Sequence, residues 1–292
     1  MQSWVNRLSP VLKRVRRFSY SNMRESVVLT NENCSEIERM LMDNGENPID
    51  LEVSENVKEE SLSRILETCQ NARIEGLSLF NYPMKERILD CLCAAISSKG
   101  FTTLGELNLA NTGITSNQLS LLLAAMSKSD LHLSSFMLDS LPSLNGSLTF
   151  LTTYPKCFEK LHFFCLDCDV LTDDSIQPLL SILQQDILSS LRFFYIRENK
   201  IKDKGVIQLI DALNDSCPSL RSLGLSYNDI SDLTLKRLIQ LFQDNGLSSL
   251  TELQIRSSSF SPLLLNKMVT TFCRGSLPLD KEISQFGVYQ RP

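Results

Sequence analysis

An apolar position recurs along most of the chain at nearly constant intervals. It is occupied by Leu51, Leu77, Leu107, Phe136, Phe164, Phe194, Leu223 and Leu253. Successive positions lie 26 to 30 residues apart. A period of this length is typical of one supersecondary unit that is repeated and stacked, rather than of a single globular core. The period therefore predicts one solenoid domain over most of the 292 residues.

Each unit changes its apolar period part-way along. In the copy that begins at Leu220, Leu223 and Leu225 alternate with small or polar residues, which is typical of a strand. Further on, Leu235, Leu238 and Ile239 follow the spacing of one helical face. Each unit is thus expected to form a short strand and a helix, whose apolar faces are buried only when neighbouring units stack.

The opening of the unit carries a motif. The copies that start at Leu191 and Leu220 read Leu-x-x-apolar-x-apolar-x-x-Asn and place Asn199 and Asn228 where the chain leaves the strand. There the amide is expected to satisfy backbone groups of the turn and of the next unit. The openings at residues 104, 161 and 250 carry Thr112, Asp169 and Ser258 instead.

This motif resembles the leucine-rich repeat. The length of the unit, with a full helix, resembles the ribonuclease-inhibitor-like class, which also forms the repeat domains of nucleotide-binding innate-immunity receptors. The resemblance covers residues 48–273, about eight units. It implies an α/β fold, a leucine-rich repeat solenoid shaped like a horseshoe, with a parallel concave sheet and convex helices. It also implies a non-enzymatic protein-interaction module.

The two ends are expected to cap the array. Residues 1–47 are predicted to form an N-terminal helical cap, with a helix within 31–47, and residues 274–292 a C-terminal cap. The apolar residues expected to close the last core are Ile283, Phe286, Val288 and Tyr289. In one internal unit, Pro142, Gly146 and Pro155 predict a short or irregular convex element. That element is either a binding loop or ordinary variation between repeats.

Residues 1–24 differ in composition from the rest of the chain. They contain six basic residues and no acidic one, and the apolar residues among them can line one face of a helix. Three interpretations remain open: a mitochondrial transit peptide, a segment lying on an anionic membrane, and a capping helix over the first repeat. The run Arg-Arg-Phe-Ser also resembles a basophilic kinase site at Ser19.

Charge and cysteine usage restrict the partners. The net charge of −5 argues against non-specific binding of nucleic acid, and the absence of an eighteen-residue apolar run predicts no membrane span. Nine cysteines without a paired framework or an apolar signal segment favour a reducing compartment, so a cytoplasmic location is expected, with mitochondria as the alternative.

No cofactor or metal is expected. The run from Cys157 to Cys168 also contains His162 and Cys165 and reads like a compact zinc site. However, His162 and Cys165 lie three positions apart on one predicted strand, and an odd separation points their side chains to opposite faces. Paired acids such as Asp173–Asp174 and Glu59–Glu60 lie where helices start, and helix capping is the preferred interpretation for them.

The strand register predicts which side chains line the concave face. Aromatic residues from adjacent units fall together there, with charges of both signs around them. This candidate partner-binding surface comprises Phe163, Phe193, Tyr195, Arg197, Asp139, Asp167 and Arg256. Clustered exposed aromatic residues mark recognition sites. The alternative is that the terminal cap or a loop covers these rings.

The function expected from the sequence is a scaffold or sensor that binds a protein partner on its concave face. One alternative is a regulator of a small GTPase, such as a GTPase-activating protein, which has the same repeat type. That resemblance would also imply an acidic C-terminal tail, whereas this chain ends Gly-Val-Tyr-Gln-Arg-Pro. A mitochondrial assembly factor is the third alternative, and it depends on residues 1–24 alone.

Overall fold

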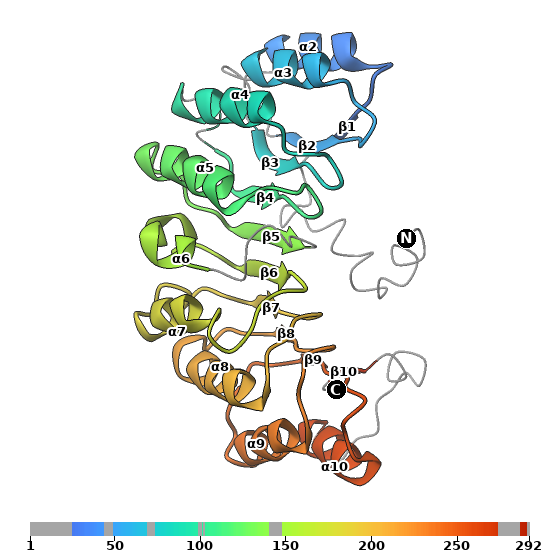
Figure 1. The fold of residues 1–292 in the computed structure, drawn as a ribbon, viewed down its shortest axis with the longest axis vertical. Helices are drawn as coiled ribbons and strands as arrows, with labels where there is room; N and C mark the ends of the chain where they lie inside the picture. The colour runs from blue at the N-terminus through green and yellow to red at the C-terminus, as the bar shows by residue number, and fades with distance from the viewer. Residues whose placement is uncertain are drawn as a thin grey trace.

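The chain forms an array of stacked strand–helix units. The computed structural model describes residues 25–43, 49–68, 74–98, 101, 103–139, 148–273 and 287–290. Within these residues a ten-stranded sheet follows the chain order from β1 to β10, and every neighbouring pair from β1 to β9 is parallel. The helices stack in a second layer on one side of the sheet, and the whole is curved (Figure 1). The predicted α/β solenoid is confirmed.

The strands are short and evenly spaced. They are β1 (Glu25–Leu29), β2 (Ile49–Val53), β3 (Ile74–Ser78), β4 (Glu106–Asn108), β5 (Ser135–Asp139), β6 (Phe163–Asp167), β7 (Phe193–Tyr195), β8 (Ser222–Gly224), β9 (Glu252–Gln254) and β10 (Val288–Gln290). The helices are α2 (Cys34–Asp43), α3 (Glu59–Thr68), α4 (Glu86–Ser97), α5 (Ser116–Lys128), α6 (Phe150–Thr153), α7 (Gln177–Gln184), α8 (Asp203–Ser216), α9 (Asp232–Gln243) and α10 (Pro262–Phe272).

The core lies between the sheet and the helices. The inward residue of each strand stacks on its counterpart in the next unit, so that Phe136, Phe164 and Phe194 form a continuous row. Their ring centroids are 6.0 Å and 5.9 Å apart along this row. All three side chains are fully buried. Each ring is buried only when the neighbouring units pack against it, so a single unit is not stable without its neighbours.

The array begins earlier than the predicted boundary at residue 48. β1 pairs in parallel with β2, with Val27 opposite Leu51, and α2 follows it on the helical side. The helix expected within residues 31–47 is therefore present, but it belongs to a strand–helix unit of the same sheet. Residues 1–24, for which the cap, targeting and membrane interpretations were made, lie outside the described residues.

The unit after β5 has the irregular convex element that its prolines and glycine predict. In place of a long helix it has the four-residue α6 and a 3₁₀ helix at Pro155–Phe158. Phe150 and Phe158 from these two short elements pack on Phe136, with ring centroids at 6.4 Å and 5.7 Å. Large aromatic side chains thus fill the volume that a longer helix occupies in other units. Pro142 and Gly146 lie outside the described residues.

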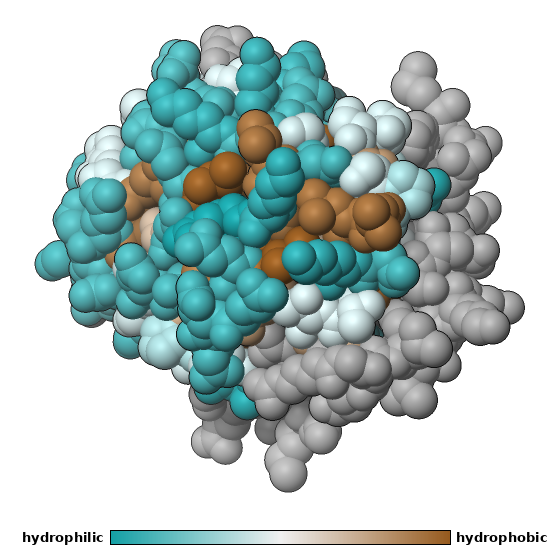
Figure 2. Space-filling view, turned by 90° about the horizontal axis from the view of Figure 1, so that it is seen from below, coloured by the Kyte–Doolittle hydropathy of each residue, from teal (hydrophilic) through white to brown (hydrophobic). Residues whose placement is uncertain are grey.

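The C-terminal end of the sheet is closed by a strand of opposite direction. β10 pairs antiparallel with β9, and its Val288 and Tyr289 are buried as predicted; Ile283 and Phe286 lie outside the described residues. Seen from this end, apolar side chains gather in a band between hydrophilic ones (Figure 2). Leu263, on the last helix α10, has a side chain that is 85% exposed.

The asparagines of the motif join neighbouring units. Asn199 Nδ2 donates to the carbonyl oxygen of Leu166 at 2.8 Å, and Asn228 Nδ2 donates to that of Ile196 at 2.8 Å. Asn228 Oδ1 also accepts from the backbone N–H of Ile201. The expected role in satisfying backbone groups is confirmed, but these partners belong to the preceding unit and not to the next one.

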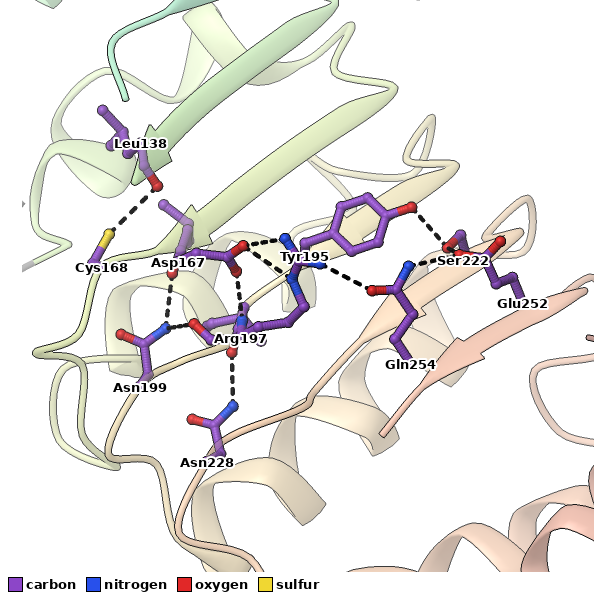
Figure 3. Close-up of polar contacts among 12 residues, drawn as sticks. Leu138, Asp167, Cys168, Tyr195, Arg197, Asn199, Ser222, Asn228, Glu252 and Gln254 are labelled. Carbon is purple, nitrogen blue, oxygen red and sulfur yellow. Dashed lines mark hydrogen bonds and ion pairs between the residues drawn. The ribbon is translucent and has the colours of Figure 1, made fainter. Parts of the chain in front are cut away.

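In the β6 unit, Cys168 and not Asp169 lies at the inward position that Asn199 and Asn228 occupy in the next two units. Its thiol points to the carbonyl oxygen of Leu138 in the preceding unit, with Sγ and O 3.6 Å apart (Figure 3). Asp169 instead has a φ of 64°, the left-handed conformation that Glu198 adopts in the β7 unit. The turn therefore comes one residue later after β6, which shifts the inward position from Asp169 to Cys168.

Aspartates at the helix starts form a second ladder between units. Asp203 Oδ1 accepts from Thr234 Oγ1 at 2.6 Å and from the N–H of Ser231 at 2.9 Å. Asp173 and Asp232 accept in the same way from the units that follow them. Asp173 therefore binds a backbone N–H of the neighbouring unit, whereas α7, the helix that follows Asp173, has no side-chain cap. Burial opposes ionisation of Asp203, but the hydrogen bonds from Thr234 and Ser231 lower its pKa below the usual 3.8.

These aspartate hydrogen bonds make the free energy of unfolding depend on pH. Because the pKa of Asp203 is lower in the folded protein than in the unfolded chain, its contribution is present above about pH 4 and is lost as the pH falls through the folded pKa. We expect Asp203→Asn to destabilise by about 1 kcal/mol at neutral pH and by less near pH 3. Urea unfolding at both pH values measures this difference. Asp244→Asn, at an exposed position, serves as the control, and an equal loss at both pH values for Asp203→Asn would contradict the ladder.

Candidate protein-binding surface

The outward side chains of the strands align in columns along the concave face. Phe163 lies opposite Phe193, which lies opposite Ser222; Cys165, Tyr195 and Gly224 form the adjacent column. The inward residues between them are fully buried on the helical side. The register predicted from the sequence is therefore confirmed over these strands.

The aromatic residues of this face pack on each other instead of projecting into solvent. Phe163 is 5% exposed and Tyr195 is 1% exposed, and they form a small apolar cluster with Cys165, against which Met137 and Phe193 pack. The ring centroid of Phe163 lies 5.6 Å from that of Tyr195 and 6.4 Å from that of Phe193. The expectation of an exposed aromatic patch is wrong for Phe163 and Tyr195.

Tyr195 is buried because the next strand leaves room for its ring. A Cβ atom at Gly224 would lie only 2.5 Å from Cδ1 of Tyr195 and 3.1 Å from Cδ of Arg197. The glycine lets the ring lie flat across β8, where the Tyr195 hydroxyl reaches Ser222 Oγ at 2.9 Å. Burial, together with the charge of Glu252, raises the pKa of Tyr195 well above its ordinary value of 10, so the phenol stays protonated.

Asp167 and Arg197 form a buried ion pair between adjacent strands. Arg197 Nη2 lies 2.5 Å and Nε 3.0 Å from Asp167 Oδ2, while the backbone N–H of Arg197 donates to Oδ1 at 2.6 Å. Their side chains are 7% and 13% exposed. The guanidinium carbon also lies 5.1 Å from the Tyr195 ring centroid, a cation–π contact. The two charges therefore neutralise each other instead of flanking an aromatic centre.

A chain of polar contacts extends from this pair across β8 and β9 (Figure 3). Arg197 Nη1 donates to Gln254 Oε1 at 3.0 Å, and Gln254 Nε2 donates to Glu252 Oε1 at 2.7 Å. Ser222 Oγ donates to the same oxygen of Glu252 at 3.0 Å. Burial opposes the charge of Arg197, but the carboxylate of Asp167 outweighs it and raises the Arg197 pKa. This closed polar network covers the concave side of β6 to β9.

The remaining candidate residues lie at the border of the network. Asp139 is half-buried and faces Asp167 across β5 and β6. Phe193 is also half-buried. Arg256 is exposed, and its Nη1 lies 3.4 Å from the hydroxyl of Tyr227, whose side chain is 52% exposed. The structure thus brings the seven candidate residues onto one face, but of these only Arg256 is exposed.

The cysteine and histidine run is divided between two sides of the sheet. Cys165 packs with Tyr195 on the concave side, whereas the thiols of Cys157 and Cys168 point to backbone carbonyl oxygens within the core. Burial raises the pKa of Cys157 to about 11. Over the part of the chain that is described, no three His, Cys, Asp or Glu side chains come together as metal ligands.

Comparisons with known proteins agree with the geometry. A family model described as a leucine-rich repeat matches residues 216–237, which span the end of α8, β8 and the start of α9. These residues thus match a leucine-rich repeat, and the stacked strand–helix units around them have the architecture that this repeat forms. No curated protein matches the sequence.

Two solved structures of low sequence identity are similar to this chain over most of its length. TLR13, in its complex with ssRNA13, is 13% identical with a TM-score of 0.41; the match covers 77% of this chain and 37% of TLR13. An internalin (inlF) from Listeria monocytogenes is 14% identical with a TM-score of 0.37, and 78% of each chain is covered. This chain therefore spans about a third of the TLR13 chain that it matches.

Nothing in the sequence indicated three residues that complete the closed polar network of β6 to β9. Ser222, Glu252 and Gln254 are all buried and link Tyr195 to Arg197. They occupy the same concave columns as the aromatic residues, so the period places them on this face, but their polar character gave no signal of burial.

Among the helices that the structure describes, none has the length and apolar character needed to cross a bilayer.

Proposed function

We propose that this leucine-rich repeat protein is a non-enzymatic scaffold or sensor that binds a protein partner on its concave face. The observation that carries the proposal is the in-register sheet, in which strands from successive units form one continuous curved layer (Figure 1). Extended concave surfaces of this kind are what solenoid proteins use for binding. The proposal includes a role in innate-immune sensing and a cytoplasmic location, the latter supported by the eight free thiols among the described residues.

The polar groups of this face support a scaffold better than an enzyme. Asp167 is paired with Arg197, and the Tyr195 hydroxyl is bonded to Ser222. A catalytic acid or base must reach a substrate proton, whereas these groups are committed to structural partners. The closed polar network therefore gives the concave face a fixed shape, and the accessible side chains around it are the proposed contacts.

The exposed border of the network offers a specific test. Arg256 and Tyr227 lie together there, and both residue types are common contributors to binding energy. We expect Arg256→Glu to abolish capture of the partner by proximity crosslinking in cells that express the full chain. The matched control is Lys236→Glu on α9, which makes the same charge change on an exposed convex position.

The comparison of the two variants decides the outcome. A protein captured by the wild type and by Lys236→Glu, but not by Arg256→Glu, supports a concave partner site near β9. A set of captured proteins that both variants retain equally contradicts it.

A further inference from the structure

Two arginines lie side by side at the edge of the sheet where the strands begin. Arg192 and Arg221 occupy the positions directly before β7 and β8. The backbone N–H of Arg221 donates to the carbonyl oxygen of Arg192 at 2.7 Å, and that of Arg192 donates to the carbonyl oxygen of His162, directly before β6, at 2.9 Å. The two positions are therefore in register on neighbouring units. Arg192 is half-buried and Arg221 is exposed, and we call this pair the arginine edge.

Other units have hydroxyl residues at this position, and those residues have a structural role. Ser134 Oγ donates to the carbonyl oxygen of Gly105 at 3.0 Å, and Thr251 Oγ1 donates to that of Arg221 at 3.1 Å. Each of these bonds joins one unit to the preceding one. The side chains of Arg192 and Arg221 make no such bond with any residue that the structure describes. The stacking of the units therefore does not require arginine at these two positions.

The charges of the arginine edge have no counter-charge within the described residues. Arg197 and Arg237 each pair with a carboxylate. Neither arginine of the edge has an ion-pair partner in the same part of the chain. Burial, and then the positive charge of Arg192, lower the pKa of His162 below its ordinary value of 6.5. The charge of Arg192 thus acts on the neighbouring unit instead of being cancelled by a carboxylate.

Two unpaired cations on adjacent units lower the stability of the array. Like charges that lie opposite each other on neighbouring strands repel and destabilise a sheet. A residue choice that costs stability without a compensating contact in the fold is typical of a functional site. Arginines one strand spacing apart, about 4.8 Å, suit a pair of adjacent carboxylates, because each guanidinium binds a carboxylate through two parallel N–H···O bonds.

We propose that the arginine edge binds an acidic segment of a protein partner. This inference rests on the proposed function, a protein-binding scaffold, and assigns a charge to the partner. The segment carries adjacent Asp or Glu residues, which lie across the starts of β7 and β8 next to the half-buried Phe193. A nucleic acid fits this edge less well, because its binding requires more phosphate contacts than two arginines supply and the chain has a net charge of −5.

Binding of a labelled oligoglutamate peptide at low salt tests the charge of the partner. Fluorescence anisotropy should detect binding to the wild type, whereas a neutral oligoglutamine peptide of the same length should not bind. Arg192→Ser combined with Arg221→Thr should weaken binding of the oligoglutamate peptide about tenfold. This variant gives both positions the residue types that Ser134 and Thr251 have in other units, so its urea midpoint of unfolding should equal or exceed that of the wild type.

Removal of the same charge from the convex helices is the control. Arg87→Gln on α4 combined with Lys204→Gln on α8 also removes two positive charges, and both side chains are exposed. Because these residues lie away from the arginine edge, this variant should bind the oligoglutamate peptide as tightly as the wild type. Circular dichroism should show that both double variants are folded.

Several results would overturn the proposal. If the wild type does not bind the peptide, or if both double variants weaken binding equally, the arginine edge is not a specific acidic-peptide site. A lower urea midpoint for Arg192→Ser/Arg221→Thr shows that the arginines serve the fold. If a single-stranded RNA oligonucleotide binds more tightly than the peptide and is lost in the same variant, the occupant is a nucleic acid. None of these results bears on the Arg256→Glu comparison, so the two proposals can fail separately.

Discussion

Replacing Phe194 with alanine is expected to lower the free energy of unfolding by about 3–5 kcal/mol. Phe194 is fully buried and its ring centroid lies 5.9 Å from that of Phe164 in the preceding unit. The substitution leaves a cavity in the aromatic row, and because units are stabilised by their neighbours, the loss extends to the adjoining units. Urea unfolding followed by circular dichroism measures the change.

The neighbouring residue is the informative comparison. From the sequence, Tyr195 is expected to be an exposed contact of the candidate partner-binding surface. Because the structure buries its ring over Gly224 and pairs its hydroxyl with Ser222, we now expect Tyr195→Ala to destabilise by about 3 kcal/mol. Tyr195→Phe keeps the ring and should cost only about 1 kcal/mol. A Tyr195→Ala variant as stable as the wild type would show that the ring is not packed in this way.

Removing one partner of the Asp167–Arg197 pair is the second substitution that is expected to lower the stability of the protein strongly. Asp167→Ala leaves the guanidinium of Arg197 buried without its carboxylate, and the loss of one member of such a pair typically costs about 3–5 kcal/mol. The backbone N–H of Arg197 also loses its acceptor. We expect a correspondingly large shift in the urea midpoint of unfolding.

A double substitution tests whether the loss of stability comes from the buried charge that is left without a partner. Asp167→Ala combined with Arg197→Met removes both charges and fills much of the space, so it should be more stable than Asp167→Ala alone. The control is Asp211→Ala, which breaks a more exposed pair with Arg237 and should cost under about 1 kcal/mol. Equal losses for Asp167→Ala and Asp211→Ala would contradict burial of the concave pair.

The repeat architecture was predictable because its signal is local and periodic. The spacing of Leu107, Phe136, Phe164 and Phe194 fixes both the strand register and the concave columns, and the structure reproduces that register. The prolines and glycine after β5 likewise predicted the short α6. Each of these inferences requires only residues within one unit and the period that relates the units.

Which side chains of the concave face are buried was not predictable from the period. Tyr195 is buried because Gly224 and Ser222, on the next strand, accept its ring and its hydroxyl. Arg197 reaches Gln254, two strands away, at 3.0 Å. Such contacts depend on side-chain conformations that join different units, and periodicity carries no information about them. The column assignment was correct, but exposure could not be deduced from it.

The start of the array was missed for a related reason. β1 continues the sheet, with Val27 opposite Leu51, but the opening before α2 lacks the full motif. The sequence therefore predicts a cap and not a strand at this place. A short apolar run of this kind becomes recognisable as a strand only when its partner strand is known.

An engineered disulfide tests the in-register parallel sheet most directly. Glu106 on β4 lies opposite Ser135 on β5, and the Cα separation of adjacent strands, about 4.8 Å, lies within the range that a disulfide spans. The comparison is Glu106→Cys with Ser134→Cys. Ser134 lies beside Gly105 and so faces the other side of the sheet from Glu106. Under mild oxidation, peptide mass spectrometry should find the crosslink in Glu106→Cys/Ser135→Cys and not in Glu106→Cys/Ser134→Cys; a crosslink in the second variant alone would contradict the stacked, in-register array.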